Sequence, residues 1–232
     1  MKCLIMAGGF GVRLYPLTQN RAKALLLYRG KPLIDYLVEM VPPDMEIMIS
    51  TNRKFEADFR KWQKDIPRKV ELCIEEAVSE DEKKGAVGAL DYWIDKKNIE
   101  EDLLLLTGDN YFEFSLSGFL DVYDGENTLF AVYDIGELSK AADFGVVVLD
   151  GSRVVELEEK PQKPKSSLVA AGSYVFPNRV FPILHNYCSE SKRDNLGSFI
   201  AHLIQVDKVY GYRFSGLWFD IGGRPELIEP SP

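Results

Sequence analysis

The first half of the chain alternates short apolar runs with segments whose apolar residues recur at helical spacing. The apolar runs are CLIMA at 3–7, EIMIST at 46–51, VELCIEE at 70–76 and DLLLLTGD at 102–109. Helix-like segments lie between them, at 31–41, 54–63 and 85–97. This alternation predicts β-α-β units and a parallel sheet. Strands so uniformly apolar are typical of a sheet that is covered on both faces.

The second half is richer in strands. Apolar runs with short polar connections favour strands at 128–135, 144–150, 153–160 and 167–177. The turn DGSR at 150–153 is typical of a hairpin. Two helix-like stretches follow, near 178–188 and 195–207, and then a strand over 208–216.

Together the halves predict an α/β fold. We expect a Rossmann-like mixed, mostly parallel sheet flanked by helices, with a β-rich lobe in the C-terminal half. No repeat and no Pro-rich linker divides the sequence, so we expect a single domain over 1–232. Its two halves, 1–135 and 136–232, meet at a soft boundary near 135–145.

Charge and hydropathy limit the partners of the chain. The 232 residues carry a net charge of −8, whereas nucleic-acid-binding proteins usually carry a basic excess. No run approaches the ~18 apolar residues of a membrane helix, and the opening segment lacks the features of a signal peptide. We therefore expect a cytoplasmic protein with no nucleic-acid or membrane partner. A homo-oligomer is compatible with the sequence.

The cysteines and histidines offer no pattern for a disulfide or a metal. Cys3, Cys73 and Cys188 lie far apart, and their odd number argues against a disulfide framework. Cys3 and Cys73 fall within apolar runs, where buried reduced thiols are common. His185 and His202 have no Cys or His partner at ligand spacing. We interpret all five as structural residues.

A glycine-rich loop follows the first apolar run. The segment AGGFGVRL at 7–14 places three glycines within four positions, namely Gly8, Gly9 and Gly11. Glycine leaves the backbone open to the close approach of a ligand. Arg13 and Lys23 follow on a segment that Pro16 and the polar TQN keep irregular.

Three kinds of ligand-binding loop are conceivable here. A dinucleotide fingerprint would need a third glycine where Leu14 stands. A Walker-type loop would need G-K-[ST] after its second glycine, and this sequence has none. The third reading is a loop whose backbone N–H groups wrap a triphosphate, with cations from Arg13 and Lys23. A tight turn with solvated basic residues is the alternative without a ligand.

A longer pattern favours the triphosphate. The spacing G-G-x-G-x-R-L-x-P-L-T-x4-K at 8–23, followed by KPLIDY at 31–36, resembles the signature of the sugar-1-phosphate nucleotidylyltransferases. In those enzymes the arginine and the lysine handle the triphosphate and the leaving pyrophosphate. The resemblance therefore implies catalytic roles for Arg13 and Lys23, and nucleotide contacts for Gly8, Gly9 and Gly11.

Later motifs continue the resemblance in the family's order. They are KGAVGAL at 84–90, LLLLTGDN at 103–110, FGVVVLDGSRVVELEEKPQKPKS at 144–166, AAGSYVF at 170–176 and WFDIGGRPE at 218–226. The resemblance implies nucleotide contacts at Gly85 and Gly88, Mg²⁺ binding at Asp109 and Asp220, sugar contacts at Asn110, Gly145, Glu159 and Gly172, and a catalytic Lys160 on the sugar phosphate. It also identifies the C-terminal lobe as the sugar-binding half.

Some positions depart from the family pattern. Val12 and Ala86 stand where threonine is common, and AKAL replaces P-K-P-L around Lys23. The acidic stretch SEDEKK at 79–84 lies between a strand and the KGAVGAL loop. The side chain near 75–84 that reads the base is therefore not assigned from the sequence.

The resemblance implies a reaction. A nucleotidyl group would pass from a nucleoside triphosphate to a sugar 1-phosphate, with Mg²⁺ as cofactor and pyrophosphate as the second product. L-E-E-K-P and T-G-D-N lie closest to the glucose-1-phosphate thymidylyltransferases, so dTTP or UTP with glucose 1-phosphate is expected. A mannose-1-phosphate guanylyltransferase and a noncatalytic nucleotide-sugar-binding subunit of the same fold are the alternatives. Retention of Arg13, Lys23, Asp109 and Asp220 favours an enzyme over the noncatalytic subunit.

Overall fold

The chain folds into two compact units that interleave along the sequence. The computed structural model describes residues 1–190 and 195–227. The first unit comprises Met1–Lys83, Leu105–Ser117 and the chain from Leu217 onward, and the second comprises Lys84–Leu104 and Gly118–Gly216. The sequence instead predicts contiguous halves of one domain, and that single domain stays a prediction.

The first unit contains a parallel sheet. Its strand order is β5-β4-β1-β6, and β4 pairs in parallel with both β1 and β5. The strands are β1 (Lys2–Met6), β4 (Ile47–Asn52), β5 (Glu71–Glu75) and β6 (Leu103–Thr107), the last of which begins in the second unit. Because parallel strands end at one edge, this edge receives the loops that follow β1, β4, β5 and β6.

Two amphipathic helices belong to the first unit. They are α1 (Leu33–Met40) and α2 (Glu56–Asp65). α1 buries Leu33 and Leu37, and α2 buries Phe59 and Trp62. In both helices the buried residues are three or four positions apart, which confirms the helices expected over 31–41 and 54–63.

Short strands complete the first unit. β2 (Leu27–Tyr28) and β3 (Lys31–Pro32) form a small antiparallel pair. β7 (Asn110–Phe112) pairs antiparallel with β13 (Trp218–Asp220), residues that are far apart in the sequence. The sequence analysis did not predict these four strands, because two or three residues are too few to show a period of two.

The second unit contains a sheet in the order β11-β8-β12-β10-β9. β12 pairs in parallel with β8, whereas β8–β11, β9–β10 and β10–β12 are antiparallel. The strands are β8 (Thr128–Asp134), β9 (Gly145–Asp150), β10 (Arg153–Glu159), β11 (Leu168–Phe176) and β12 (Val209–Phe214). All five were expected, and the pairing of Arg153 with Asp150 confirms the hairpin.

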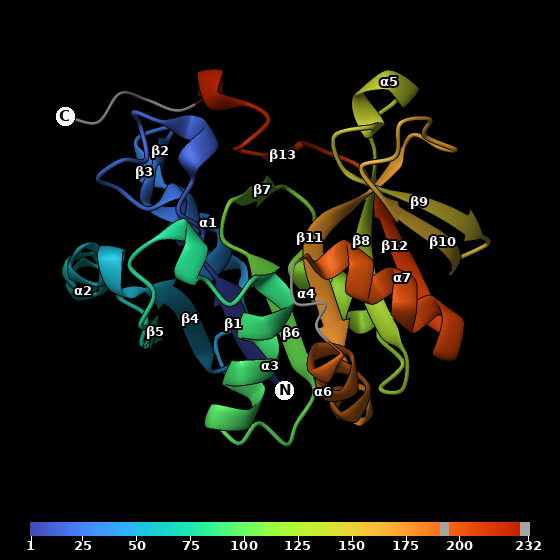
Figure 1. The fold of residues 1–232 in the computed structure, drawn as a ribbon, viewed down its shortest axis with the longest axis horizontal. Coiled ribbons are helices and arrows are strands. Elements are labelled where there is room, and N and C mark those ends of the chain that lie inside the picture. Colours follow the sequence, from blue (N-terminus) through green and yellow to red (C-terminus); the bar gives the residue numbers. More distant parts are fainter. Residues whose placement is uncertain (191–194, 228–232) are drawn as a thin grey trace. The chain divides into compact units, whose positions relative to one another are not determined.

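Helices pack around this second sheet. They are α3 (Ala86–Lys96), α4 (Leu116–Asp121), α5 (Leu138–Ala141), α6 (Phe181–Ser189) and α7 (Leu196–Val206), and α4 begins in the first unit. α7 packs against β10, and α6 lies beside α3 (Figure 1). The parallel sheet of the first unit and the mixed sheet of the second confirm the mixed α/β fold class. Among the described residues, no helix has the length and apolar run needed to cross a bilayer.

Candidate active site

The glycine loop is held in shape by two other residues of its own motif. Gly11 has φ +66°, in the left-handed region that favours glycine. A Cβ on Gly11 would lie 2.9 Å from Thr18 Cβ and 3.0 Å from Lys23 Cγ. The buried Thr18 Oγ1 also donates a hydrogen bond to the Gly11 carbonyl at 2.6 Å. Thr18 and Lys23 thus pack directly against the loop, and this contact explains the spacing of the motif.

A buried carboxylate adjoins the start of the same loop. Glu75, at the end of β5, is only 7% exposed, and its Oε1 lies 3.3 Å from where a Cβ on Gly8 would stand. Ser50 Oγ donates to this oxygen at 2.9 Å, and Asn52 Nδ2 donates to the Gly8 carbonyl at 2.9 Å. Sequence reasoning missed Glu75. The alternation of side chains along β5 could have predicted its burial, because Glu75 lies two residues after Cys73 and shares the buried face of the strand.

Two predicted metal ligands come together through the pairing of β7 with β13. Asn110, which follows Asp109, is the register partner of Asp220, and Ile221 N donates to the Asp109 carbonyl at 2.9 Å. Lys23 Nζ forms an ion pair with Asp109 Oδ2 at 3.2 Å. A Cβ on Gly222 would lie 3.0 Å from Asp220 Oδ1 and 3.3 Å from Lys23 Nζ. Lys23, Asp109 and Asp220 therefore surround one small space.

Asn110 orients the Asp109 carboxylate. Its Nδ2 donates to Asp109 Oδ1 at 3.1 Å and to Thr107 Oγ1 at 2.7 Å. Its Oδ1 accepts from Trp218 Nε1 at 2.9 Å, and the side chain is buried. The indole therefore fixes the amide, and the amide in turn fixes the carboxylate. Trp218 was not assigned a role from the sequence, and the sugar contact expected of Asn110 stays a prediction.

An aromatic core anchors the segments that carry these polar residues. Tyr28 packs against Tyr111 at 4.9 Å between ring centroids, and Tyr111 stacks on Phe219 at 5.1 Å. Burial, with the nearby Glu113 carboxylate, raises the pKa of Tyr111 to about 12. The core also contains Leu14, Leu26, Leu33 and Ile221. Leu14 follows Arg13, Tyr111 follows Asn110, and Phe219 precedes Asp220. Packing of the core therefore fixes the backbone at the neighbouring polar residues, Arg13, Asn110 and Asp220.

The donor set of this cluster fits a hard divalent cation. Carboxylate oxygens are the protein ligands that Mg²⁺ prefers, usually one or two together with water and phosphate oxygens. Asp109 and Asp220 supply two carboxylates. Within residues 1–190 and 195–227 no group of three or more His, Cys, Asp or Glu forms a closed metal cage. An open site that completes its shell with phosphate and water matches this arrangement.

Arg13 lies on the exposed side of the loop. It belongs to a 3-10 helix, Val12–Leu14, and its side chain forms no ion pair with any described residue. A guanidinium placed in this way is available to the oxygens of an anionic ligand.

A second cluster, in the second unit, surrounds the Glu159 carboxylate. Glu159, the last residue of β10, is the register partner of Gly145 on β9. A Cβ on Gly145 would lie 3.1 Å from Glu159 Oε2, and a Cβ on Gly197 would overlap the same oxygen. Burial raises the pKa of Glu159, and Lys160 opposes that shift in part. Both glycines therefore provide the space that this half-buried carboxylate occupies.

Gly197 was not predicted as a site residue. It lies in the first turn of α7, where the side chain of Asn195 caps the helix by accepting from Ser198 N at 2.8 Å. A glycine inside an apolar helix costs about 1 kcal/mol relative to alanine, so its presence in LGSFIAHL was a signal of close packing.

The other predicted residues of the second unit occupy turns and irregular backbone. Gly85 (φ +76°) immediately precedes α3, and Gly88 is buried within that helix. Gly172 (φ +71°) lies at an irregularity of β11, between Ala170 and Tyr174. Lys160 is exposed with φ +49°. The structure thus groups Gly8, Gly9, Gly11, Arg13, Lys23, Asp109, Asn110 and Asp220 in the first unit, and Gly85, Gly88, Gly145, Glu159, Lys160 and Gly172 in the second.

Comparisons with known proteins identify the family and the fold. The sequence profile of the nucleotidyl transferase family matches residues 2–232. The chain is 30% identical to the bifunctional protein GlmU of Methanocaldococcus jannaschii, over 99% of this chain and 53% of that protein. It is also 30% identical to a proposed mannose-1-phosphate guanyltransferase of Sulfolobus acidocaldarius, over 96% of this chain and 60% of that protein. The chain thus spans a little over half the length of these curated relatives.

A solved structure shares the fold over most of both chains. It is a proposed glucose-1-phosphate thymidylyltransferase from Bacillus anthracis, in complex with sucrose. The TM-score is 0.82 at 25% sequence identity, and the match covers 96% of this chain and 90% of that one. A UDP-glucose pyrophosphorylase from Acinetobacter baumannii, at 20% identity and a TM-score of 0.77, supports the fold alone.

Proposed function

The chain belongs to the nucleotidyl transferase family, and from this premise we propose that it transfers a nucleotidyl group from a nucleoside triphosphate to a sugar 1-phosphate. The products are a nucleoside diphosphate sugar and pyrophosphate. The observation that carries the proposal is the grouping of Lys23, Asp109 and Asp220 in the unit that holds the glycine loop. Two similar proteins are named as sugar-1-phosphate nucleotidyltransferases, which supports a sugar 1-phosphate as the acceptor.

The reaction is an in-line displacement at phosphorus. A phosphate oxygen of the sugar 1-phosphate attacks the α-phosphorus of the triphosphate, a new P–O bond forms, and the bond to the β-phosphate oxygen breaks. A phosphate monoester loses its second proton near pH 6, so the nucleophile is ionised without a strong general base. Repulsion between the anionic nucleophile and the polyanionic triphosphate is the main obstacle. The protein therefore has to position the reactants and neutralise charge.

Basic residues carry out this neutralisation. Arg13 offers a rigid fork to phosphate oxygens, and Lys23 offers a point charge to the triphosphate and the leaving pyrophosphate. Lys160 holds the phosphate of the sugar 1-phosphate. The backbone N–H groups of the glycine loop bind the triphosphate without the bulk of side chains.

Asp109 and Asp220 would hold Mg²⁺, which would supply charge compensation for the phosphates when bound. Asn110 and Trp218 keep the Asp109 carboxylate oriented. Gly222 N donates to Asp220 Oδ1 at 2.6 Å, which fixes the second carboxylate. These positioning contacts matter because a loosely held ligand lowers both metal affinity and activity.

The second unit binds the sugar. The half-buried Glu159 carboxylate accepts hydrogen bonds from sugar hydroxyls, and the absence of a side chain at Gly145 leaves it room. The irregular backbone at Gly172 contacts the same sugar. Gly85 and Gly88 supply close backbone contacts to the nucleotide.

For the individual substrates, we propose dTTP or UTP with glucose 1-phosphate. The motifs L-E-E-K-P and T-G-D-N support this choice, as does the likeness to the Bacillus anthracis protein. A few hydrogen bonds at the edge of the base determine such selectivity.

Glu75 favours a second candidate, GTP with mannose 1-phosphate. An ionised carboxylate accepts hydrogen bonds and donates none. The Glu75 carboxylate is buried beside Gly8. Guanine presents a ring N–H and an amino group side by side, which suit a carboxylate. Uracil and thymine present one N–H between two carbonyls, which suit it less well. The similarity to the Sulfolobus acidocaldarius protein points the same way.

One panel of assays tests both candidates. Pyrophosphate release is measured with Mg²⁺ and glucose 1-phosphate for dTTP, UTP, GTP, CTP and ATP, and the panel is repeated with mannose 1-phosphate. We expect release with dTTP or UTP that requires both the sugar phosphate and Mg²⁺. Release with GTP alone, shifted toward UTP by Glu75→Gln, would establish the second candidate. No release with any pair of substrates would overturn the enzymatic proposal in favour of a noncatalytic subunit.

A further inference from the structure

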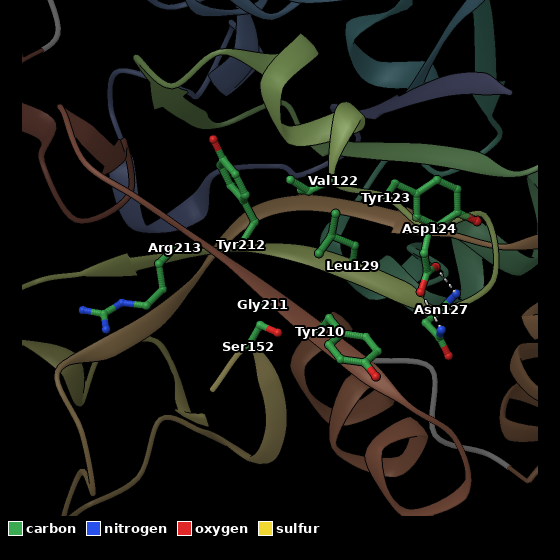
Figure 2. Close-up of a pocket in the computed structure, with 10 residues that line it drawn as sticks. All are labelled: Val122, Tyr123, Asp124, Asn127, Leu129, Ser152, Tyr210, Gly211, Tyr212 and Arg213. Carbon is green, nitrogen blue, oxygen red and sulfur yellow. Dashed lines mark hydrogen bonds between the residues drawn. The ribbon is translucent and has the colours of Figure 1, made fainter. Parts of the chain in front are cut away.

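A pocket in the second unit, which we call the tyrosine pocket, is lined only by residues to which the proposed reaction gives no role. Its volume is about 340 Å³, and it lies between β12 and the connection from α4 to β8. Figure 2 shows its lining, with Leu129 and Val122 near the centre and tyrosines around them. This volume is at the lower end of the range found for small-molecule sites.

Aromatic rings form much of the pocket wall. Tyr210 and Tyr212 lie two residues apart on β12, and Tyr123 lies on the connection from α4 to β8 (Figure 2). Two of the rings are held by their neighbours: Tyr212 packs edge-on against Phe119 at 5.4 Å, and the Tyr123 hydroxyl donates to Asp102 Oδ2 at 2.9 Å. Rigid aromatic walls suit a flat ring, because stacking on a fixed side chain loses little conformational entropy.

The two β12 tyrosines lie on one face of the strand, and Gly211 between them points to the other. A Cβ on Gly211 would lie 2.9 Å from Val132 Cγ2 and 3.0 Å from Leu149 Cδ2. That direction is therefore filled by packed side chains. Since side chains alternate along a strand, Tyr210 and Tyr212 project to the opposite face, where the pocket opens.

The pocket also has polar groups at its rim. Asn127 Nδ2 donates to Asp124 Oδ2 at 2.7 Å, and this bond turns the amide oxygen away from Asp124. Ser152 and Arg213 lie along the other side. An apolar slot with a few hydrogen-bonding groups at its edge is the usual form of a small-molecule site.

A second pocket, of about 660 Å³, shares Asn127 with the tyrosine pocket. We call it the basic pocket because Arg153, Arg179 and Lys208 line it and outnumber its two acidic residues, Glu126 and Asp207. Arg153 lines the basic pocket and is the register partner of Tyr210, so both side chains leave the same face of the sheet. Arg179 is bound to Asp207 and to the Glu126 carbonyl. In contrast, neither Arg153 nor Lys208 forms an ion pair with a described residue, so both charges are available to an anion.

These pockets are separate from the Glu159 cluster. Arg153 and Glu159 are the first and last residues of β10. At a rise of about 3.3 Å per residue, the six steps between them span about 20 Å. A ligand of the tyrosine pocket is therefore distinct from a sugar held at Glu159.

We propose that the tyrosine pocket and the basic pocket together bind a nucleotide. Its base stacks on Tyr210 and Tyr212, and its phosphate pairs with Arg153 and Lys208. The combination of aromatic rings with adjacent unpaired cations favours a nucleotide over a neutral sugar, which needs no cation, and over inorganic phosphate, which needs no ring. The proposal does not depend on the activity proposed above.

Amide chemical shifts test the site directly. UMP and GMP are titrated separately into the ¹⁵N-labelled 232-residue chain without divalent metal, with glucose 1-phosphate and inorganic phosphate as separate arms. We expect at least one nucleotide to shift the amides of Ser152, Gly211 and Arg213 along a saturating curve. Arg153→Ser and Tyr210→Ser should each weaken that binding about tenfold. Lys61→Ser removes an exposed charge on α2 and should leave the binding unchanged.

Several results would overturn the site. Absence of a saturating shift at these amides with either nucleotide would exclude it. Equal shifts with inorganic phosphate would indicate an adventitious ion only, and tighter binding of glucose 1-phosphate would exclude recognition of a base. Nucleotide binding that both pocket variants retain at full strength would place it elsewhere. Thermal unfolding of each variant establishes that any loss of binding occurs in a folded protein.

Discussion

Replacement of Gly197 by alanine tests the arrangement around Glu159. The added Cβ would overlap Glu159 Oε2 and would lie 3.3 Å from both Glu159 Cδ and Leu157 Cδ2. The carboxylate therefore has to move, because the Cβ belongs to a helix that packs against β10. If Glu159 holds the sugar, its displacement weakens sugar binding without touching the triphosphate groups.

The expected magnitudes separate binding from stability. Alanine is favoured over glycine within a helix by about 1 kcal/mol, whereas an overpacked core costs about 1–3 kcal/mol. The unfolding free energy should therefore fall by no more than about 2 kcal/mol. Loss of one hydrogen bond to a charged group costs about 1.5–3 kcal/mol. The KM for the sugar 1-phosphate should accordingly rise by about 10- to 150-fold.

Steady-state kinetics with each substrate varied in turn provide the assay. We expect the KM of the sugar 1-phosphate to rise while that of the triphosphate stays within about twofold of wild type. Ser198→Ala is the matched control, since it changes the same helical turn without adding an atom. In a Glu159→Gln background the Gly197→Ala effect should shrink, because the two residues act through one contact. An unchanged KM for the sugar phosphate in a folded Gly197→Ala protein would refute the reasoning.

The remaining predictions concern the first unit and the titration of Glu159. Asp109→Asn should raise the Mg²⁺ concentration needed for half-maximal turnover by at least about tenfold; a wild-type metal titration would remove Asp109 from the metal site. Arg13→Ala should lower turnover by about 10²-fold and alter the unfolding free energy by less than about 0.5 kcal/mol, so wild-type activity would contradict the phosphate contact. Gly11→Ala should lower the unfolding free energy by about 1–3 kcal/mol in urea denaturation, owing to its positive φ and its contact with Thr18; an unchanged midpoint would contradict it. Burial raises the pKa of Glu159, so its contribution to stability is complete below its unfolded pKa and is lost as pH rises through the folded one. The unfolding free energy of Glu159→Gln relative to wild type should therefore increase as the pH rises above the unfolded pKa of Glu159, and a difference that does not change with pH would count against the burial.

Local pattern was sufficient to predict most of the longer elements. β1, α1 and the β9–β10 hairpin each show a period or turn within a few consecutive residues, and each was expected close to its observed bounds. Lys23 of the glycine-loop motif packs against that loop, while its catalytic role stays a prediction. These features are determined by neighbours in the sequence, which is why sequence reasoning found them.

Contacts between distant segments were not predictable in the same way. The pairing of β7 with β13 joins residues about one hundred positions apart, and its three-residue strands carry no period. Burial of Glu75 and the space that Gly197 leaves for Glu159 depend on which side chains meet in the fold. The tyrosine pocket likewise arises only when the connection after α4 meets β12. Sequence spacing alone contains none of this geometry.

Transfer of labelled nucleotide is the most direct test of the proposed function. The full chain is incubated with Mg²⁺, a sugar 1-phosphate and each triphosphate labelled at the α-phosphorus, and the products are separated. The account predicts that the label appears in a nucleoside diphosphate sugar, with one equivalent of pyrophosphate released, and that Asp109→Asn and Arg13→Ala suppress both products. Label that stays in the triphosphate, or that appears in a nucleoside monophosphate without the sugar, would contradict it.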